Sequence, residues 1–243
     1  VVMREDLRGD LQSHSTYSDG RRTMREMAFA AAERGHEYFA VTDHGQNLSV
    51  VRSLSLEDID RQAGEIRRIN EELEGRMTLL HGLEANIGLD GELDYPDDVL
   101  AKFDVVVASL HHGLQMERGP MTARVLRALA HPEVNVFGHP TARMLPRRPA
   151  SDFDLEAACR AAADHGVAME LNASPRRLDL KDDHAVVARE AGCLFAISTD
   201  AHSIDELDYL QFGVGTAQRA WLEPDRIVTT WPLARLRGFL AKR

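Results

Sequence analysis

Seven short, largely apolar runs recur along the chain and alternate with longer segments of helical character. The runs span residues 9–20, 39–45, 79–87, 105–112, 134–140, 167–174 and 194–202. Two of them, VVVASL and LFAIST, are apolar almost throughout, which is typical of parallel strands that helices cover on both faces. The pattern therefore predicts an α/β fold in which strands and helices alternate along the chain.

The segments between these runs have the spacing of amphipathic helices. We expect helices over 22–35, 56–74, 119–131, 154–165, 182–192 and 232–241. Three of them end at a glycine that can adopt the left-handed conformation of a helix C-cap, namely Gly35, Gly166 and Gly192. Because about seven strands alternate with helices and no linker divides the sequence, we expect one domain over residues 1–243, a (β/α) barrel of seven strands.

Histidine and acidic side chains lie at or just past the ends of six of the seven runs. Barrel enzymes carry their chemistry at the carboxyl ends of their strands, so these side chains are expected to meet at one mouth of the barrel. Imidazole and carboxylate ligands together favour Zn, Mn or Fe over Mg or Ca. The sequence predicts a site for several metal ions, with His14, Asp19, His44, Glu84, His111, His139, Asp200 and His202 as candidate ligands.

Other polar residues near the runs fit simpler roles. We expect Asp43 to cap the turn that follows it, and Asp10 to orient a ligand without touching a metal. Six histidines lie off the strand-end pattern or within helices and are expected to be structural: His36, His81, His112, His131, His165 and His184.

Charge weighs against tight binding of nucleic acid by this chain alone. The 39 acidic residues outnumber the 29 basic ones, for a net charge of −10, whereas affinity for nucleic acid usually comes from a basic face. Local basic clusters remain at Arg143, Arg147 and Arg148 and at Arg176 and Arg177. Any contact with DNA is therefore expected to be local and weak.

Cysteine content and hydropathy bear on the compartment. Cys159 and Cys193 lie in apolar patterns without metal spacing, so we expect two buried free thiols in a reducing cytoplasm. No apolar run approaches the ~18 residues of a membrane helix, and no signal-peptide pattern opens the sequence. The expected localisation is cytoplasmic, without a membrane partner.

Four longer segments carry a family resemblance. They are DLRGDLQSHSTYSDG, LEANIGLDGELDYPDDVLAKFDVVVASLHHG, ELNASPRRLDL and STDAHSIDELDYLQFGVGTAQRAWL. Together they resemble the polymerase-and-histidinol-phosphatase (PHP) family of metal-dependent phosphoesterases, and most closely the C-terminal PHP domain of bacterial family X DNA polymerases. The resemblance implies a distorted (β/α)7 barrel that holds up to three divalent ions, Mn, Zn or Fe. It also implies polymerase domains N-terminal to this segment in a parent protein, which nothing in this sequence resembles.

The same resemblance implies how the ligands divide among the ions. The first ion would take Gln12, His14, Glu84 and Asp200, the second Glu84, His111 and His139, and the third Asp19, His44 and His202. Gln12 departs from the family pattern, which commonly has the first His of a His-x-His pair there. An amide oxygen is a weak, neutral ligand, so we expect the first ion to bind more loosely.

The expected reaction is hydrolysis of a phosphate ester by metal-activated water. Glu84 and Asp200 would act through the ions that they hold. Arg177 is the first candidate for a phosphate clamp, and Arg143 is the second.

The sequence leaves the substrate open. The family X resemblance implies DNA 3′ ends, as in a 3′–5′ exonuclease, a 3′-phosphatase or an abasic-site nuclease. The acidic charge favours a small phosphomonoester instead, such as a histidinol, sugar or nucleotide phosphate. A third possibility is a metal-stabilised scaffold without catalysis that supports a partner polymerase.

Overall fold

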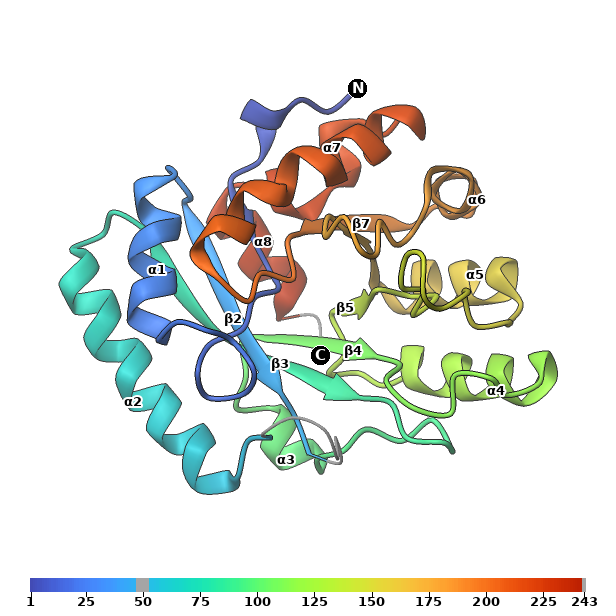
Figure 1. Cartoon of the computed structure of the whole chain (residues 1–243), viewed down its shortest axis with the longest axis horizontal. Coiled ribbons are helices and arrows are strands. Elements are labelled where there is room, and N and C mark those ends of the chain that lie inside the picture. The colour runs from blue at the N-terminus through green and yellow to red at the C-terminus, as the bar shows by residue number, and fades with distance from the viewer. Residues whose placement is uncertain (47–52, 242–243) are drawn as a thin grey trace.

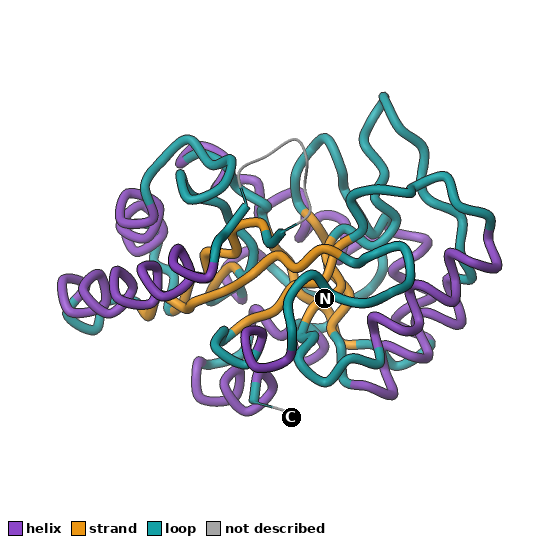
Figure 2. The backbone as a smooth tube through the Cα atoms, turned by 90° about the horizontal axis from the view of Figure 1, so that it is seen from below, coloured by secondary structure: helices purple, strands orange, loops and turns teal. Residues whose placement is uncertain are grey.

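The computed structural model describes residues 1–46 and 53–241. Its parallel strands form one seven-stranded sheet in which each strand pairs with the next along the chain. The strands are β1 (Gly9–Asp10), β2 (Tyr38–His44), β3 (Thr78–Asn86), β4 (Val105–Ser109), β5 (Val136–Gly138), β6 (Ala168–Asn172) and β7 (Leu194–Ser198). Figure 2 shows the strands gathered in the middle of the molecule, with most of the helices around them.

The barrel closes through very few backbone contacts. Strand β1 has two residues, and Ser13 forms an isolated parallel bridge with Ala201 beyond the end of β7. The amide of His14 donates to the carbonyl of Ala201 at 2.8 Å, and the amide of Asp200 donates to the carbonyl of Gln12 at 3.0 Å. The structure confirms the expected distorted (β/α)7 barrel, nearly closed at the seam between β1 and β7.

Helices lie outside the strands (Figure 1); those before β7 connect successive strands, and two more follow β7. They are α1 (Met24–Glu33), α2 (Leu56–Leu73), α3 (Asp97–Leu100), α4 (Arg118–Leu129), α5 (Leu155–His165), α6 (Asp182–Glu190), α7 (Leu210–Arg219) and α8 (Leu233–Leu240). The six helices expected from the sequence are confirmed, with ends that differ by at most two residues. The glycines that follow α1, α5 and α6 do adopt positive φ, +80° at Gly35, +64° at Gly166 and +88° at Gly192.

Helix α7 was not predicted from the sequence. Its segment LQFGVGTAQR contains two glycines, which lower helix propensity. Gly213 is required by packing, because a Cβ there would lie 2.6 Å from Cγ2 of Ile197 in β7. The helix is therefore stabilised by its close approach to the barrel rather than by local propensity.

The end of the barrel at which the strands begin is apolar and closed. Side chains from the strand interiors, among them Tyr38, Val107 and Val136, pack with Leu236 and Leu240 of α8 in one buried cluster. The side-chain amide of Asn135 also donates to the carbonyl of Leu240 at 3.1 Å. Because this end is filled, polar chemistry inside the barrel is confined to the opposite end, where the strands terminate.

Two further expectations concern cysteine and membranes. Cys159 and Cys193 are buried free thiols, as the sequence predicts. Among the residues that the structure describes, no helix has the length and apolar character needed to cross a membrane.

Candidate metal centre

The polar residues expected at the strand ends come together at the carboxyl end of the barrel. His14 and Asp19 lie in the loop after β1, and His44 is the last residue of β2. Glu84 lies within β3, and the remaining candidates follow later strands: His111 after β4, His139 after β5, and Asp200 and His202 after β7. The barrel thus brings six sequence-distant segments into one cluster.

Glu84 is the centre of the larger half of this cluster. Its Oε1 lies 2.8 Å from Nε2 of His139 and 3.1 Å from Nε2 of His111. Its Oε2 lies 3.3 Å from Nε2 of His14 and 3.2 Å from Nδ1 of His44. Burial raises the pKa of Glu84, but the imidazoles of His44, His111 and His139 outweigh it and hold that pKa well below its usual range. A fully buried carboxylate is therefore kept ionised and faces several nitrogen ligands.

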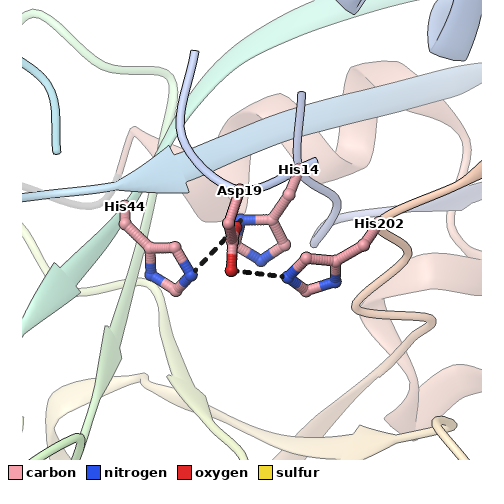
Figure 3. A group of neighbouring side chains, drawn as sticks. All are labelled: His14, Asp19, His44 and His202. Carbon is pink, nitrogen blue, oxygen red and sulfur yellow. Dashed lines mark hydrogen bonds and ion pairs between the residues drawn. The ribbon is translucent and has the colours of Figure 1, made fainter. Parts of the chain in front are cut away.

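Asp19 organises the outer half. Its Oδ1 lies 3.3 Å from Nε2 of His44, and its Oδ2 lies 3.2 Å from Nε2 of His202. Figure 3 shows Asp19 between these two rings, with His14 close behind it. The His14 ring stacks on both, with centroids 4.5 Å from His44 and 4.2 Å from His202. Burial opposes an ionised Asp19, but the three histidines lower its pKa.

Three groups of atoms are close enough to share an ion. Within each group the candidate ligand atoms lie within 4.8 Å of one another: His14, Asp19, His44 and His202; His44, Glu84 and His111; and His14, Glu84 and Asp200. The third group contains the implied first set without Gln12. In the second, His44 stands where His139 was expected, although His139 contacts the same carboxylate. His14 and His44 each lie within reach of two groups.

The donor atoms fit divalent metal ions. Nδ1 of His14, His44 and His139 and Oε2 of Glu84 are buried without a hydrogen-bond partner among the described residues. A buried polar atom left in this state costs free energy unless something coordinates it. Asp200 and His139 also adopt φ of +56° and +26°, backbone conformations that are strained for such residues and that cluster at functional sites.

Gln12 lies fully inside the protein at the barrel seam. Neither its Oε1 nor its Nε2 has a hydrogen-bond partner among the residues that the structure describes. Its Oε1 would lie 3.5 Å from a Cβ placed on Gly138 in β5, so the amide reaches across the interior. The site therefore presents a buried neutral amide next to the charged ligands.

Buried carboxylates hold the ligand loops in place. Asp10 accepts from the backbone amide of Gln12 at 3.1 Å and from the hydroxyl and amide of Thr199, which ties the two sides of the seam. The expectation that Asp43 caps the next turn is wrong. Asp43 is buried in β2 and accepts from Ser15 and Ser18 at 2.6 Å each, because the loop that carries Asp19 folds back over it.

Three supporting residues were missed from the sequence. Glu170 accepts from the backbone amide of His139 at 2.6 Å, and the amide of Asn172 donates to Asp200 at 3.2 Å. Asn86 lies 3.3 Å from Nδ1 of His111. Glu170 and Asn172 sit at alternate positions near the end of an apolar run, a period-two signal that could have placed both side chains inside the barrel.

The six histidines expected to be structural lie outside the cluster. His36 and His81 are buried, and burial lowers the pKa of each to about 4. His81 bonds Gln62 at 3.0 Å. The set is completed by His112, His131, His165 and His184, none of which belongs to a group of candidate metal ligands among the described residues.

The two candidate phosphate clamps differ in their surroundings. Arg177 is mostly buried, its Nε lies 3.3 Å from Asp200, and its Nη1 has no partner among the described residues. Arg143 donates through Nε to the carbonyl of Arg177 at 2.8 Å and through Nη2 to the carbonyl of Leu178. Arg143 thus binds backbone carbonyls of the loop after β6, so Arg177 is the better placed of the two candidates.

A cavity of about 330 Å³ opens directly beside the cluster. It is lined by Asp19, Arg21, Met144, Ser174, Arg176, Arg177, Asp200, His202 and Glu206. Ligand pockets usually measure ~300–1,000 Å³, so this is a small site. Its lining combines the candidate metal ligands Asp19, Asp200 and His202 with three arginines, which is a composition suited to an anionic ligand.

A parallel barrel with clustered His, Asp and Glu side chains at its strand ends, beside an arginine-lined cavity, defines a metal-dependent hydrolase of phosphate esters. The sequence model of the PHP domain matches residues 10–174. The chain belongs to the PHP family and is a phosphoesterase that binds divalent metals.

Relatives of two kinds are similar to this chain. The DNA polymerase/3′-5′ exonuclease PolX of Bacillus subtilis (strain 168) is 39% identical over 236 residues, which cover 97% of this chain and 41% of that protein. The chain thus spans less than half the length of PolX. A probable phosphatase of Shewanella sp. (strain MR-4) is 27% identical over 91% of this chain and 86% of that protein.

The fold is shared with a solved histidinol phosphate phosphatase. The structure from Lactococcus lactis, complexed with Zn, L-histidinol and phosphate, aligns with a TM-score of 0.66. It is 20% identical, and the alignment covers 89% of this chain and 94% of that one. At this identity the likeness shows the barrel architecture.

Proposed function

We propose that this chain hydrolyses phosphate esters at DNA 3′ ends, as a 3′–5′ exonuclease, a 3′-phosphatase or a nuclease that processes abasic sites. The observation that carries the proposal is that one cavity is lined both by members of the histidine-carboxylate cluster and by three arginines. The cluster members are Asp19, Asp200 and His202, and the arginines are Arg21, Arg176 and Arg177. The similarity to PolX, over nearly the whole of this chain, supports DNA as the substrate.

The proposed ligands would hold up to three ions, Mn, Zn or Fe. The first would take His14, Glu84, Asp200 and Gln12, the second Glu84, His111 and His139, and the third Asp19, His44 and His202. When bound, such ions supply Lewis acidity toward phosphoryl oxygens and lower the pKa of water. The nitrogen-rich donor set favours Mn, Zn or Fe over Mg and Ca.

The protein's own side chains then bind and orient the substrate. Nη1 of Arg177 has no partner among the described residues and can donate to a phosphoryl oxygen, while its Nε stays within reach of Asp200. Asn172 and His14 hold the two oxygens of Asp200, at 3.2 and 3.0 Å. The carboxylate therefore keeps its orientation when substrate enters, which is the preorganisation that favours catalysis.

The test compares a 3′-labelled oligonucleotide with p-nitrophenyl phosphate, each with added Mn. We expect Mn-dependent loss of 3′-terminal nucleotides or phosphates at high enzyme concentration. Binding should be weak with a shallow salt dependence, because one to three phosphate contacts each contribute about −0.7 to the logarithmic salt slope on single strands. Replacing Arg177 by Ala should slow the reaction more than it weakens metal binding, with Arg147→Ala as the matched control.

Hydrolysis of a small phosphomonoester is the second candidate. Two observations favour it: the net charge of −10, and a probable phosphatase that matches this chain along 86% of its own length. Rapid turnover of small phosphomonoesters, with every DNA end left intact, would replace the DNA proposal by this one.

A further inference from the structure

Two arginines of the cavity have no side-chain partner among the residues that the structure describes. Arg21 and Arg176 are exposed, and neither side chain makes a hydrogen bond or ion pair with the rest of the described chain. Several other arginines form ion pairs with Asp or Glu side chains, among them Arg8, Arg25, Arg34, Arg61, Arg118, Arg127, Arg219 and Arg235. Arg21 and Arg176 thus bring to this cavity two guanidinium groups that form no ion pair with the described residues.

The carboxylates of the cavity are already engaged with other groups. Asp19 faces the rings of His44 and His202, and Asp200 contacts His14 and Arg177. Glu206 accepts from the backbone amide of His202 at 2.7 Å. The cavity thus holds two guanidinium groups that form no ion pair with a carboxylate among the described residues, in addition to Arg177 beside Asp200.

Both arginines are fixed through their backbones next to the cluster. The amide of Arg21 donates to the carbonyl of His202 at 2.7 Å, and the carbonyl of Arg176 accepts from the amide of Leu145 at 2.6 Å. These contacts tie Arg21 to the loop after β7 and Arg176 to the loop after β5. The backbone of each arginine is therefore held in place by a hydrogen bond, and its side chain lines the cavity.

We propose that this cavity binds a substrate with two phosphate groups, one hydrolysed beside the metal ligands and Arg177, the other held by Arg21 and Arg176. The inference rests on the proposed function and deepens it. Arginine is suited to such a role, because its planar guanidinium binds phosphate oxygens through two parallel hydrogen bonds. At a DNA 3′ end that bears a phosphate, the second group is the 5′ phosphate of the same nucleotide. A deoxynucleoside 3′,5′-bisphosphate is the smallest molecule with both.

The experiment compares deoxythymidine 3′,5′-bisphosphate with deoxythymidine 3′-monophosphate on the Mn-loaded protein. We expect the bisphosphate to have a KM at least about tenfold lower, with a similar kcat, since a charge-assisted hydrogen bond contributes at least about that factor. The double variant Arg21→Ala/Arg176→Ala should abolish the difference by raising the KM of the bisphosphate alone. Arg22→Ala/Arg147→Ala is the control, because these exposed arginines do not line the cavity.

Calorimetric titration of both nucleotides into the same proteins gives a readout independent of turnover. Equal affinity for the two nucleotides in the unaltered protein would overturn the inference, and so would an equal loss of bisphosphate affinity in the control variant. Absence of hydrolysis of either nucleotide and of every DNA end would contradict the proposed function instead, while the calorimetry would still decide whether a second phosphate binds.

Discussion

Replacing Glu84 by Gln removes one negative charge and keeps the shape of the side chain. Glu84 belongs to two of the three groups of candidate ligands and contacts four imidazoles within 3.3 Å. Two opposite unit charges about 4 Å apart interact by about 4 kcal/mol at an effective dielectric constant of about 20. A divalent ion interacts with the carboxylate more strongly than a single charge does, and the cost of removing water from both groups offsets part of this gain. The substitution is therefore expected to remove about 4 kcal/mol of metal-binding free energy. We therefore expect about 1,000-fold weaker binding of the ions that touch Glu84.

The assay is metal analysis by mass spectrometry after gel filtration at fixed free Mn, next to phosphoesterase activity. Glu84→Gln should lose the ions of two groups, keep the ion of Asp19, His44 and His202, and lose activity. Glu190→Gln, on the exposed face of α6, is the control for a lost surface charge, and far-UV circular dichroism checks folding. Full metal content with retained activity would refute the bridging role of this carboxylate.

Three further outcomes are expected. Gln12→His replaces a weak amide ligand by a nitrogen ligand, so metal retention after dialysis should rise and activity should appear at lower Mn; no change in either would show that residue 12 does not face an ion. Arg143→Ala should lower kcat/KM about tenfold through loss of two hydrogen bonds to the loop of Arg177, and should cost little more in an Arg177→Ala background; fully additive losses would refute this coupling. Burial lowers the pKa of His81 and His36 to about 4, and each therefore favours folding above the unfolded pKa of about 6.5. As the pH falls toward 4, the unfolded state binds protons that the folded state does not. The free energy of unfolding then decreases by up to about 3 kcal/mol for each histidine. Urea unfolding from pH 7.5 to 4.5 measures how the free energy of unfolding changes with pH. This change should be smaller in His81→Asn than in the unaltered protein, and an equal change would contradict the assignment.

Much of the fold follows from local sequence. Six helices and the order of seven strands are readable from apolar periodicity and from glycines such as Gly166, because helix and strand periods are properties of neighbouring residues. Helix α7 is not readable in this way. Gly213 disfavours a helix locally, and its lack of a side chain helps only because Ile197 of β7 lies against it.

The residue types of the candidate site, and their delivery at strand ends, were likewise determined by the sequence. Their grouping was decided by the tertiary structure: His14 and Asp200 are separated by 186 residues and meet at 3.0 Å because the barrel closes at that seam. The packed barrel also places Ser15 and Ser18, in the loop of Asp19, within hydrogen-bond distance of Asp43. It likewise places Arg143 against the backbone carbonyls of the loop after β6. A sequence fixes which polar groups are available, but partners for buried polar groups depend on distances that only the packed barrel sets.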